Sequence, residues 1–252
     1  MQAMFAPLNM SVLILGIYLS NKKNHIKHIV EEFSASSQWK VVQKWIAIGE
    51  KAPAPEVSNV TTTTNKESAP KFVLLNSILS KENLDSYDFV IICDDDITLP
   101  RGFLKTYLDL VLKYDFALAQ PARTHGSFID WPFVEQLDGL NARRTHFVEI
   151  GPLFSVRTDI FSEIFPFDES CYMGWGFDFV WPCLIHRLAL RMGIIDATPV
   201  NHSLRKPVNY YEHADADQSM QDYLSRHPHL SKGDAFLILE SYAKDWNVTK
   251  EM

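Results

Sequence analysis

The sequence lacks an excess of positive charge, is poor in cysteine, and has no apolar run of membrane-spanning length. Its 252 residues carry 24 Lys and Arg against 31 Asp and Glu, a formal net charge of −7, which argues against a general nucleic-acid-binding surface. The three cysteines show no paired spacing, so we interpret them as reduced thiols of a cytoplasmic protein. The apolar run at residues 12–19 is too short to span a bilayer and lacks signal-peptide flanks, so we expect no integral membrane segment.

A glycine-rich phosphate-binding fingerprint is also missing. Gly16 alone interrupts the first apolar run, residues 11–19, which excludes a Rossmann dinucleotide site of the GxGxxG type. The polar turn that follows contains Asn21 and Lys22, whose side chains are donors suited to a nucleotide. A plain turn between a strand and a helix would have the same composition, so both interpretations stay open.

What the sequence does contain is a regular alternation of apolar runs and amphipathic stretches without any internal repeat. This alternation predicts one α/β domain over residues 1–252, with a mostly parallel central sheet flanked by helices. The strands are expected at residues 11–19, 39–48, 89–93, 116–120, 146–156 and 193–200. The helices are expected at residues 25–34, 71–80, 101–113, 178–190, 215–225 and 234–242, with one more starting at Thr158 and a long mobile loop at 51–69.

Three consecutive carboxylates, Asp94, Asp95 and Asp96, directly follow the apolar run at residues 89–93. A continuous apolar run rich in β-branched residues indicates a strand buried on both faces, and ligands bind at the carboxyl ends of such strands. Extended geometry would place Asp94 and Asp96 on one face, roughly 6–7 Å apart. Hard cations such as Mg²⁺ and Mn²⁺ prefer oxygen ligands of this kind. The alternative is a solvated acidic turn after a core strand.

A second unusual stretch is Gly174-Trp175-Gly176-Phe177-Asp178. Its glycines would allow close approach to a ligand, and Trp175 could stack on a sugar ring. Asp178 begins an apolar helix, where the helix dipole alone would favour an acid. The functional alternative is that Asp178 points into the same cleft as the acid triplet.

Three further polar residues are candidates for the same site. Lys71 and Asn76 lie in the expected helix 71–80 and could face the ligand, or could equally be a solvated end and a surface position. His202 follows the last expected strand directly. A lone histidine is usually structural, but one at a strand end in a chain with an acid triplet is a reasonable metal ligand.

Taken in this order and spacing, the acid triplet, the Gly-Trp-Gly-x-Asp loop and the late histidine resemble those of GT-A-fold glycosyltransferases. In that fold an α/β nucleotide-binding domain carries a D-x-D motif after a central strand. The resemblance covers roughly residues 12–205. A closer likeness is to a family of GT-A-like proteins of uncharacterised activity, carried by residues 120–122, 148–155 and 175–178.

The resemblance implies a nucleotide-binding half at about 11–120, an acceptor half at about 121–205 and a helical tail at 206–252. It implies transfer of a sugar from a nucleotide diphosphate to an acceptor hydroxyl, on a carbohydrate or another molecule, with Mn²⁺ or Mg²⁺ as the cofactor. Asp96 and His202 would bind the metal, Asp94 would bind the metal or the ribose, and Asp95 would act by hydrogen bonding. The donor would contact Gly16, Tyr18, Asn21, Lys22, Lys71, Asn76, Asp94, Asp95, Trp175 and Gly176.

Asp178 would be the general base, which predicts inversion at the anomeric carbon. One departure weakens that assignment: in inverting members a second acid often follows, whereas here Phe179 does. Three alternatives remain. A sugar-nucleotide pyrophosphorylase has a related fold but usually a Gly-rich N-terminal signature with Arg and Lys, absent here. The others are a non-catalytic sugar-binding module and a structural protein with an acidic turn.

Overall fold

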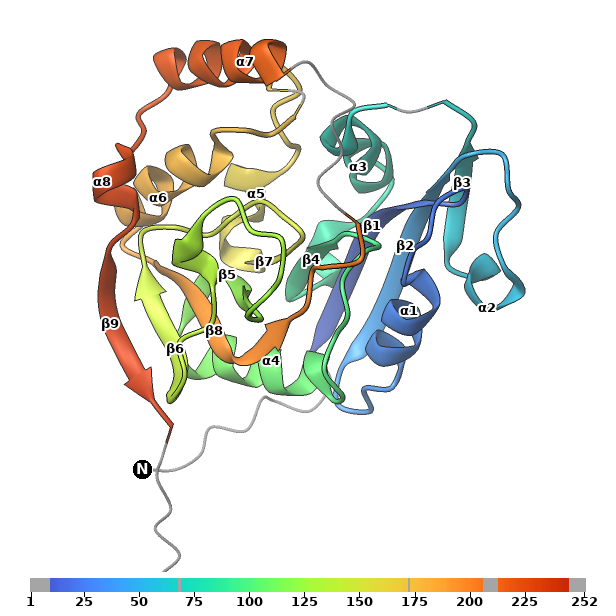
Figure 1. Ribbon diagram of the computed structural model, residues 1–252, viewed down its shortest axis with the longest axis horizontal. Coiled ribbons are helices and arrows are strands. Elements are labelled where there is room, and N and C mark those ends of the chain that lie inside the picture. The colour runs from blue at the N-terminus through green and yellow to red at the C-terminus, as the bar shows by residue number, and fades with distance from the viewer. Residues whose placement is uncertain (1–9, 68, 172, 206–212, 245–252) are drawn as a thin grey trace, which may run out of the picture.

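The computed structural model describes residues 10–67, 69–171, 173–205 and 213–244, which build one mixed sheet with helices on both faces (Figure 1). The strands are β1 (Ser11–Leu19), β2 (Lys40–Ile48), β3 (Thr61–Asn65), β4 (Phe89–Cys93), β5 (Phe116–Arg123), β6 (Leu140–Thr145), β7 (Leu153–Arg157), β8 (Arg191–Val200) and β9 (Ile238–Ala243). The helices are α1 (Ile26–Ser34), α2 (Pro55–Ser58), α3 (Lys71–Leu79), α4 (Phe103–Lys113), α5 (Phe161–Ile164), α6 (Phe177–Arg187), α7 (His213–Arg226) and α8 (Lys232–Ala235).

The strand order is β3-β2-β1-β4-β7-β5-β8-β6-β9. β1 pairs in parallel with β2 and β4, and β5 pairs in parallel with β8. Only β7 and β6, among the described strands, run against the others, because each pairs antiparallel with both of its neighbours. The expected α/β domain is therefore confirmed, with a sheet that is mixed in its second half. The carboxyl ends of β1, β4, β5 and β8 all reach the same edge.

The core lies on both sides of the central strands, as their continuous apolar runs predicted. Val12 and Ile14 of β1 pack in a cluster with α1 and α4, whereas Leu13 and Leu15 pack in a second cluster with α3 and α6. β4 alternates in the same way. In the view of Figure 1, α3, α6 and α7 lie above the sheet and α4 lies below it. Two packed layers hold β4 rigidly, and with it the start of the acid triplet.

Three sequence expectations about the elements were wrong. The segment 51–69 is not a plain loop, because it contains α2 and β3, and β3 extends the sheet by pairing with β2. The strand expected at 146–156 is instead a loop followed by β7, and the preceding β6 lies in a segment expected to be irregular. The helix expected at 234–242 is the short α8 followed by strand β9, which pairs with β6. The segment 206–212 lies outside the described residues.

Two smaller boundaries also differ. β5 continues through Pro121 to Arg123, whereas the proline was expected to end it. Thr158 does not cap a helix with its side chain: a 3₁₀ turn, Thr158–Ile160, leads into the four-residue α5. The extension of β5 matters for the site, because Arg123 at its end donates a hydrogen bond to Glu149 in the loop between β6 and β7.

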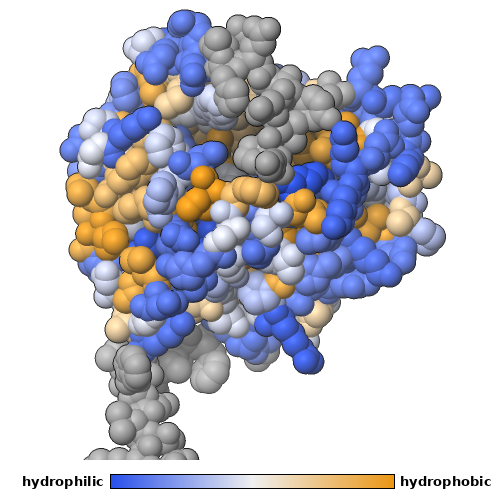
Figure 2. Space-filling model, in the orientation of Figure 1, coloured by the Kyte–Doolittle hydropathy of each residue, from blue (hydrophilic) through white to orange (hydrophobic). Residues whose placement is uncertain are grey.

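The surface near β9 carries the exposed large apolar side chains of the described chain, which are Leu137, Leu237, Ile238 and Leu239. Figure 2 shows hydrophobic surface on the side of the molecule where α8 and β9 lie. The three cysteines are free, as their spacing indicated. No helix within the described ranges combines the length and apolar character that a bilayer span requires.

Candidate active site

A cavity of about 620 Å³ opens where β4, β5 and β8 end. It brings together six of the residues singled out in the sequence, which are Lys71, Asp94, Trp175, Gly176, Asp178 and His202. Most of its other lining residues come from three regions: the loop after β5 (Phe128, Asp130, Trp131), the loop before β7 (Glu149, Ile150, Gly151, Pro152) and the C-terminal helices (Asp217, Met220, Lys232). Met173, Phe72 of α3 and Phe179 of α6 complete the lining. A second, more open hollow along α3 is lined by Asn76 and by none of the other residues singled out in the sequence.

Asp94 lies at the cavity wall with its carboxylate turned to Lys71. The Lys71 Nζ to Asp94 Oδ1 distance is 2.5 Å. The backbone N–H of Asp94 donates to the carbonyl of Pro152 at 2.7 Å, which fastens the loop before β7 against the end of β4. Lys71 starts α3, so the pair joins the β4 end to this helix. An ammonium group at this position suits a bound phosphate.

Asp96 lies next to His202, and the resemblance implied that both would bind the metal. His202 Nε2 lies 3.3 Å from Asp96 Oδ1. Two antiparallel backbone hydrogen bonds between Thr98 and Asn201 bring the segment after β4 beside the end of β8. The backbone N–H of His202 donates to Ser127 Oγ at 3.1 Å. Residues about a hundred positions apart are thus joined by main-chain pairing.

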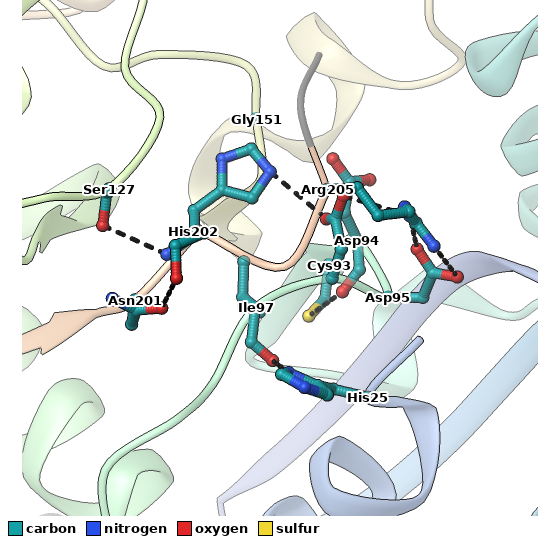
Figure 3. Close-up of polar contacts among 12 residues, drawn as sticks. His25, Cys93, Asp94, Asp95, Ile97, Ser127, Gly151, Asn201, His202 and Arg205 are labelled. Carbon is teal, nitrogen blue, oxygen red and sulfur yellow. Dashed lines mark hydrogen bonds and ion pairs between the residues drawn. The ribbon is translucent and has the colours of Figure 1, made fainter. Parts of the chain in front are cut away.

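Asp95 is buried and braces the structure. Its side chain accepts the Leu19 N–H at 2.7 Å and pairs with both terminal nitrogens of Arg205 (Figure 3). Arg205 also binds Asp96 Oδ2 at 3.0 Å and the Lys23 carbonyl at 2.8 Å. Burial raises the pKa of Asp95 above its ordinary value, although the hydrogen bond and the charge of Arg205 oppose this rise. Asp95 therefore has few free positions for a ligand, and Arg205 is a site residue that the sequence reasoning passed over.

Few of the described side chains are placed to bind a metal ion. Among residues 10–67, 69–171, 173–205 and 213–244, no three His, Cys, Asp or Glu side chains are grouped so as to hold an ion. Asp96 and His202 supply one oxygen and one nitrogen at a common point, while Asp94 is engaged by Lys71. Mg²⁺ is typically held by one or two carboxylates together with water and substrate phosphates. The pair fits an ion that a diphosphate helps to bind.

Asp178 lies in the first turn of α6 and lines the cavity. It is 6% exposed, and its Oδ1 has no hydrogen-bond partner within the described chain. Burial, together with the negative charge of Glu149, raises the pKa of Asp178 to about 7. Such a carboxylate takes up a proton readily near neutral pH, which suits a general base.

Glu149 is the second carboxylate on this side. Burial raises its pKa to about 7, opposed by the charge of Arg123. The fully buried Arg123 donates to Glu149 Oε2 at 2.9 Å, to the Gly151 carbonyl, and to the Pro121 carbonyl at 3.0 Å. The buried Gln120 accepts the Glu149 N–H. An acid inside an apolar run was the sequence signal for Glu149, but no role was assigned to it.

The two glycines of the Gly-Trp-Gly loop are required by the backbone conformation and by packing against core side chains. Gly174 and Gly176 have φ of +75° and +105°, which side chains rarely adopt. A Cβ at Gly174 would collide with the Phe72 ring, and one at Gly176 would meet Tyr223 Cδ1 at 3.2 Å. The expected close approach is therefore made to core rings, and the backbone bend that results presents Trp175 to the cavity.

Several residues expected to contact the donor lie elsewhere. Gly16 is closed off by the Trp45 ring and the Cys93 carbonyl. Tyr18 is buried, with its hydroxyl 3.0 Å from Thr61 Oγ1. Asn21 accepts the Lys51 N–H at 3.1 Å, whereas Lys22 is exposed.

Asn76 has a structural task. Its side-chain amide donates to the Phe167 carbonyl and to Glu169 Oε1, both at 2.9 Å, and its Oδ1 accepts the Phe167 N–H at 2.9 Å. These bonds tie α3 to the segment after α5. Asn76 does not line the main cavity.

The C-terminal segment completes the cavity, although the sequence suggested only packing for it. Asp217 and Met220 of α7 and Lys232 of α8 line its wall. The Lys232 ammonium lies 4.5 Å from the centre of the Trp131 ring. No sequence signal linked these residues to the acids, because the contact depends on how the tail packs.

Solved structures with a similar fold were found by comparison. GalNAc-T7 with UDP, GalNAc and Mn²⁺ aligns with a TM-score of 0.57 at 11% identity, over 85% of this chain and 47% of that one. S. aureus TarS 1–349 in complex with UDP-GlcNAc aligns with a TM-score of 0.51 at 10% identity, over 86% of this chain and 72% of that one. The chain has the GT-A fold.

The GT-A chain described here spans about half the length of the GalNAc-T7 chain. No protein-family model and no curated protein sequence matches it. At these identities the likeness establishes the fold alone, because one fold hosts many activities. The activity has to be argued from the site.

Proposed function

We propose that this protein is a glycosyltransferase that moves a sugar from a nucleotide diphosphate to an acceptor hydroxyl with the help of a divalent cation. One observation carries the proposal: a single cavity joins a phosphate-suited end, at Lys71, Asp94 and His202, to the buried carboxylate of Asp178, whose Oδ1 has no partner among the residues that the structure describes. Donor handling and proton removal need those two kinds of group. The solved GT-A structures, with UDP or UDP-GlcNAc bound, support uridine nucleotides as the first donors to test.

At the donor end, Asp96 and His202 would hold Mn²⁺ or Mg²⁺, in line with the D-x-D interpretation of Asp94 and Asp96. When bound, the ion supplies Lewis-acid stabilisation of the leaving diphosphate. Lys71 and Arg205 add positive charge next to it, and Asp94 lies where it can contact the ion or the ribose. Arg205 holds Asp95 and Asp96 together, so it also keeps the ligand pair in place.

At the acceptor end, Asp178 would remove the proton of the attacking hydroxyl. The acceptor oxygen forms a bond to the anomeric carbon while the bond from that carbon to the diphosphate oxygen breaks, and the electron pair leaves with the diphosphate. Attack from the side opposite the leaving group inverts the anomeric carbon. Burial and the charge of Glu149 raise the pKa of Asp178 to about 7, which strengthens it as a base for the acceptor hydroxyl.

The test is a transfer assay with a panel of nucleotide sugars and Mn²⁺, followed by variants. Asp178→Asn should bind the nucleotide as the wild type does and lose transfer by at least a hundredfold, in the range typical for a general base. The control is Asp109→Asn, at an exposed pair with Lys105, which should retain full activity. Full transfer by Asp178→Asn would remove the base assignment. Release of pyrophosphate from a nucleoside triphosphate would instead favour a pyrophosphorylase.

A further inference from the structure

The carboxylates at the acceptor end of the cavity include Glu149 and Asp178, and the reaction proposed above uses only Asp178 for the proton transfer. Glu149 and Asp178 line the same cavity, from the loop before β7 and from the first turn of α6. Their surroundings differ: within the described part of the chain, the buried Asp178 Oδ1 has no hydrogen-bond partner, whereas Glu149 Oε2 accepts a hydrogen bond from Arg123. This difference suggests two different contacts to one ligand.

We propose that Glu149 and Asp178 form a saccharide acceptor subsite, in which Asp178 faces the attacking hydroxyl and Glu149 accepts a hydrogen bond from a neighbouring hydroxyl of an uncharged sugar. This rests on the glycosyl transfer proposed above. It names the substrate class on the acceptor side and gives Glu149 a direct binding role.

The hydrogen-bond state of Asp178 points to a ligand hydroxyl. A buried polar atom without a partner is costly and uncommon in folded proteins. Asp178 is 6% exposed, its Oδ1 lacks any partner in the described chain, and the residue borders the cavity. A hydroxyl entering the cavity would satisfy this oxygen.

The support behind Glu149 fixes its direction. Arg123, fully buried, binds Glu149 Oε2 at 2.9 Å and the carbonyls of Pro121 and Gly151. The side chain of Gln120 accepts the Glu149 N–H. Three of these contacts, to the Glu149 carboxylate, the Glu149 N–H and the Gly151 carbonyl, run from the end of β5 to this loop and hold both its backbone and its carboxylate. Such preorganisation lowers the entropy cost of binding a small ligand.

The remaining lining of this end suits a sugar ring. Phe128, Trp131, Trp175 and Phe179 give it aromatic walls, which cover apolar faces of a ligand while a few polar groups fix its orientation. Trp131 is held by the Lys232 ammonium over its ring, at 4.5 Å from the centre.

The charge of this end disfavours an anionic acceptor. Besides Lys71 and Asp94 at the other end, the described lining residues carry four carboxylates, Asp130, Glu149, Asp178 and Asp217, and one ammonium, that of Lys232. Arg123 pairs with Glu149 from behind. Like charges in a partly buried site repel strongly because the effective dielectric constant is low. A phosphorylated or uronic acid acceptor would meet this repulsion, and a neutral saccharide would not.

The experiment measures saccharide binding by calorimetry and by saturation-transfer NMR, with UDP and Mn²⁺ present. The probes are the methyl pyranosides of glucose, galactose, mannose and N-acetylglucosamine, with glucose 6-phosphate and glucuronic acid as the charged set. We expect at least one neutral glycoside to bind and the charged sugars to bind more weakly. Glu149→Gln should weaken the neutral sugar by about tenfold, as expected for loss of a hydrogen bond to a charged group.

Two controls separate this effect from misfolding. Glu149→Gln keeps an oxygen for Arg123 but removes its counter-charge, so we expect a lower melting temperature, whereas the affinity for UDP of the folded variant should stay at the wild-type value. Glu163→Gln, at an exposed pair with Arg187, should leave saccharide binding unchanged.

The outcomes are distinguishable. Absence of binding of every nucleoside diphosphate to the wild type would overturn the proposed function and this inference with it. With UDP bound, three results would overturn the acceptor subsite alone: no neutral glycoside binds, a charged sugar binds more tightly, or Glu149→Gln binds the sugar as the wild type does.

Discussion

Asp178 illustrates how burial sets the chemistry of a single carboxylate. Desolvation and the charge of Glu149 raise its pKa to about 7, whereas an exposed Asp titrates near about 3.9. At a pH between these two pKa values, Asp178 keeps its proton in the native state but has released it in the unfolded state. The stability of the protein should therefore fall as pH rises from about 4 to about 7.

The Asp178→Asn variant tests this coupling, because it cannot ionise. Its melting temperature relative to the wild type should be higher at pH 8 than at pH 5, by a few degrees on the scale of about 2–4 °C per kcal/mol for a domain of this size. Differential scanning calorimetry across this pH range gives the comparison. Parallel curves for the two proteins would mean that Asp178 titrates as an exposed acid does.

Asp95 shows the opposite use of an acid from the same triplet. It is 3% exposed, accepts the Leu19 N–H and pairs with Arg205. We expect Asp95→Ala to lower the free energy of unfolding in urea by roughly 2–4 kcal/mol, because it leaves the Leu19 N–H without its acceptor and removes the main counter-charge of the partly buried Arg205. Asp109→Ala, at an exposed helix pair, should cost below about 0.5 kcal/mol. Similar costs for both variants would contradict the bracing role.

At the scale of elements, the sequence predicted β1, α1, β2, α3, β4, α4 and β8 to within a few residues. Their patterns are local: β1 and β4 are continuous apolar runs, and α1 buries Ile26, Ile29, Val30 and Phe33 at helical spacing. β3 was missed because its polar residues form no apolar run, and β9 was mistaken for a helix because its first residues continue an apolar run. Only their neighbours β2 and β6 hold the two strands extended. The antiparallel β7 was placed too early, since the apolar loop before it resembles a strand.

Gly16 links an element to its neighbours and gives a prediction at this scale. A Cβ at this position of β1 would collide with the Trp45 ring and the Cys93 carbonyl. Gly16→Ala should therefore destabilise the protein by about 1–3 kcal/mol, the usual cost of overpacking a core. Gly233→Ala is the control, because its nearest neighbour, Ser231 Oγ, lies 3.7 Å away. If Gly16→Ala unfolds in urea like the wild type, the packing around β1 is looser than described.

At the scale of the whole molecule, ligand binding should appear as stability. A ligand at a hundredfold excess over its dissociation constant adds about 2.7 kcal/mol, or roughly 5–10 °C for a domain of this size. We expect UDP with Mn²⁺ to raise the melting temperature by this amount, and EDTA to remove most of the gain.

The metal dependence of that shift should vanish in Asp96→Ala, which loses the carboxylate facing His202. The nucleotide alone should still give a smaller shift through Lys71 and Arg205. A shift in the variant that still responds to EDTA would place the ion elsewhere. No shift in the wild type with any nucleotide would count against the proposed donor class.

By itself, the sequence determined the α/β class, the central strands and the position of the acids at a strand end. These features follow from local periodicity and from the order of residues along the chain. It could not assign tasks within the triplet. Only the tertiary structure turned Asp94 to Lys71, Asp95 to Arg205 and Asp96 to His202, because the partner of each carboxylate comes from a distant segment. The same holds for Glu149, which depends on Arg123, and for the tail that closes the cavity. Burial and pairing across the fold, rather than residue type, decide which acids brace the protein and which face a ligand.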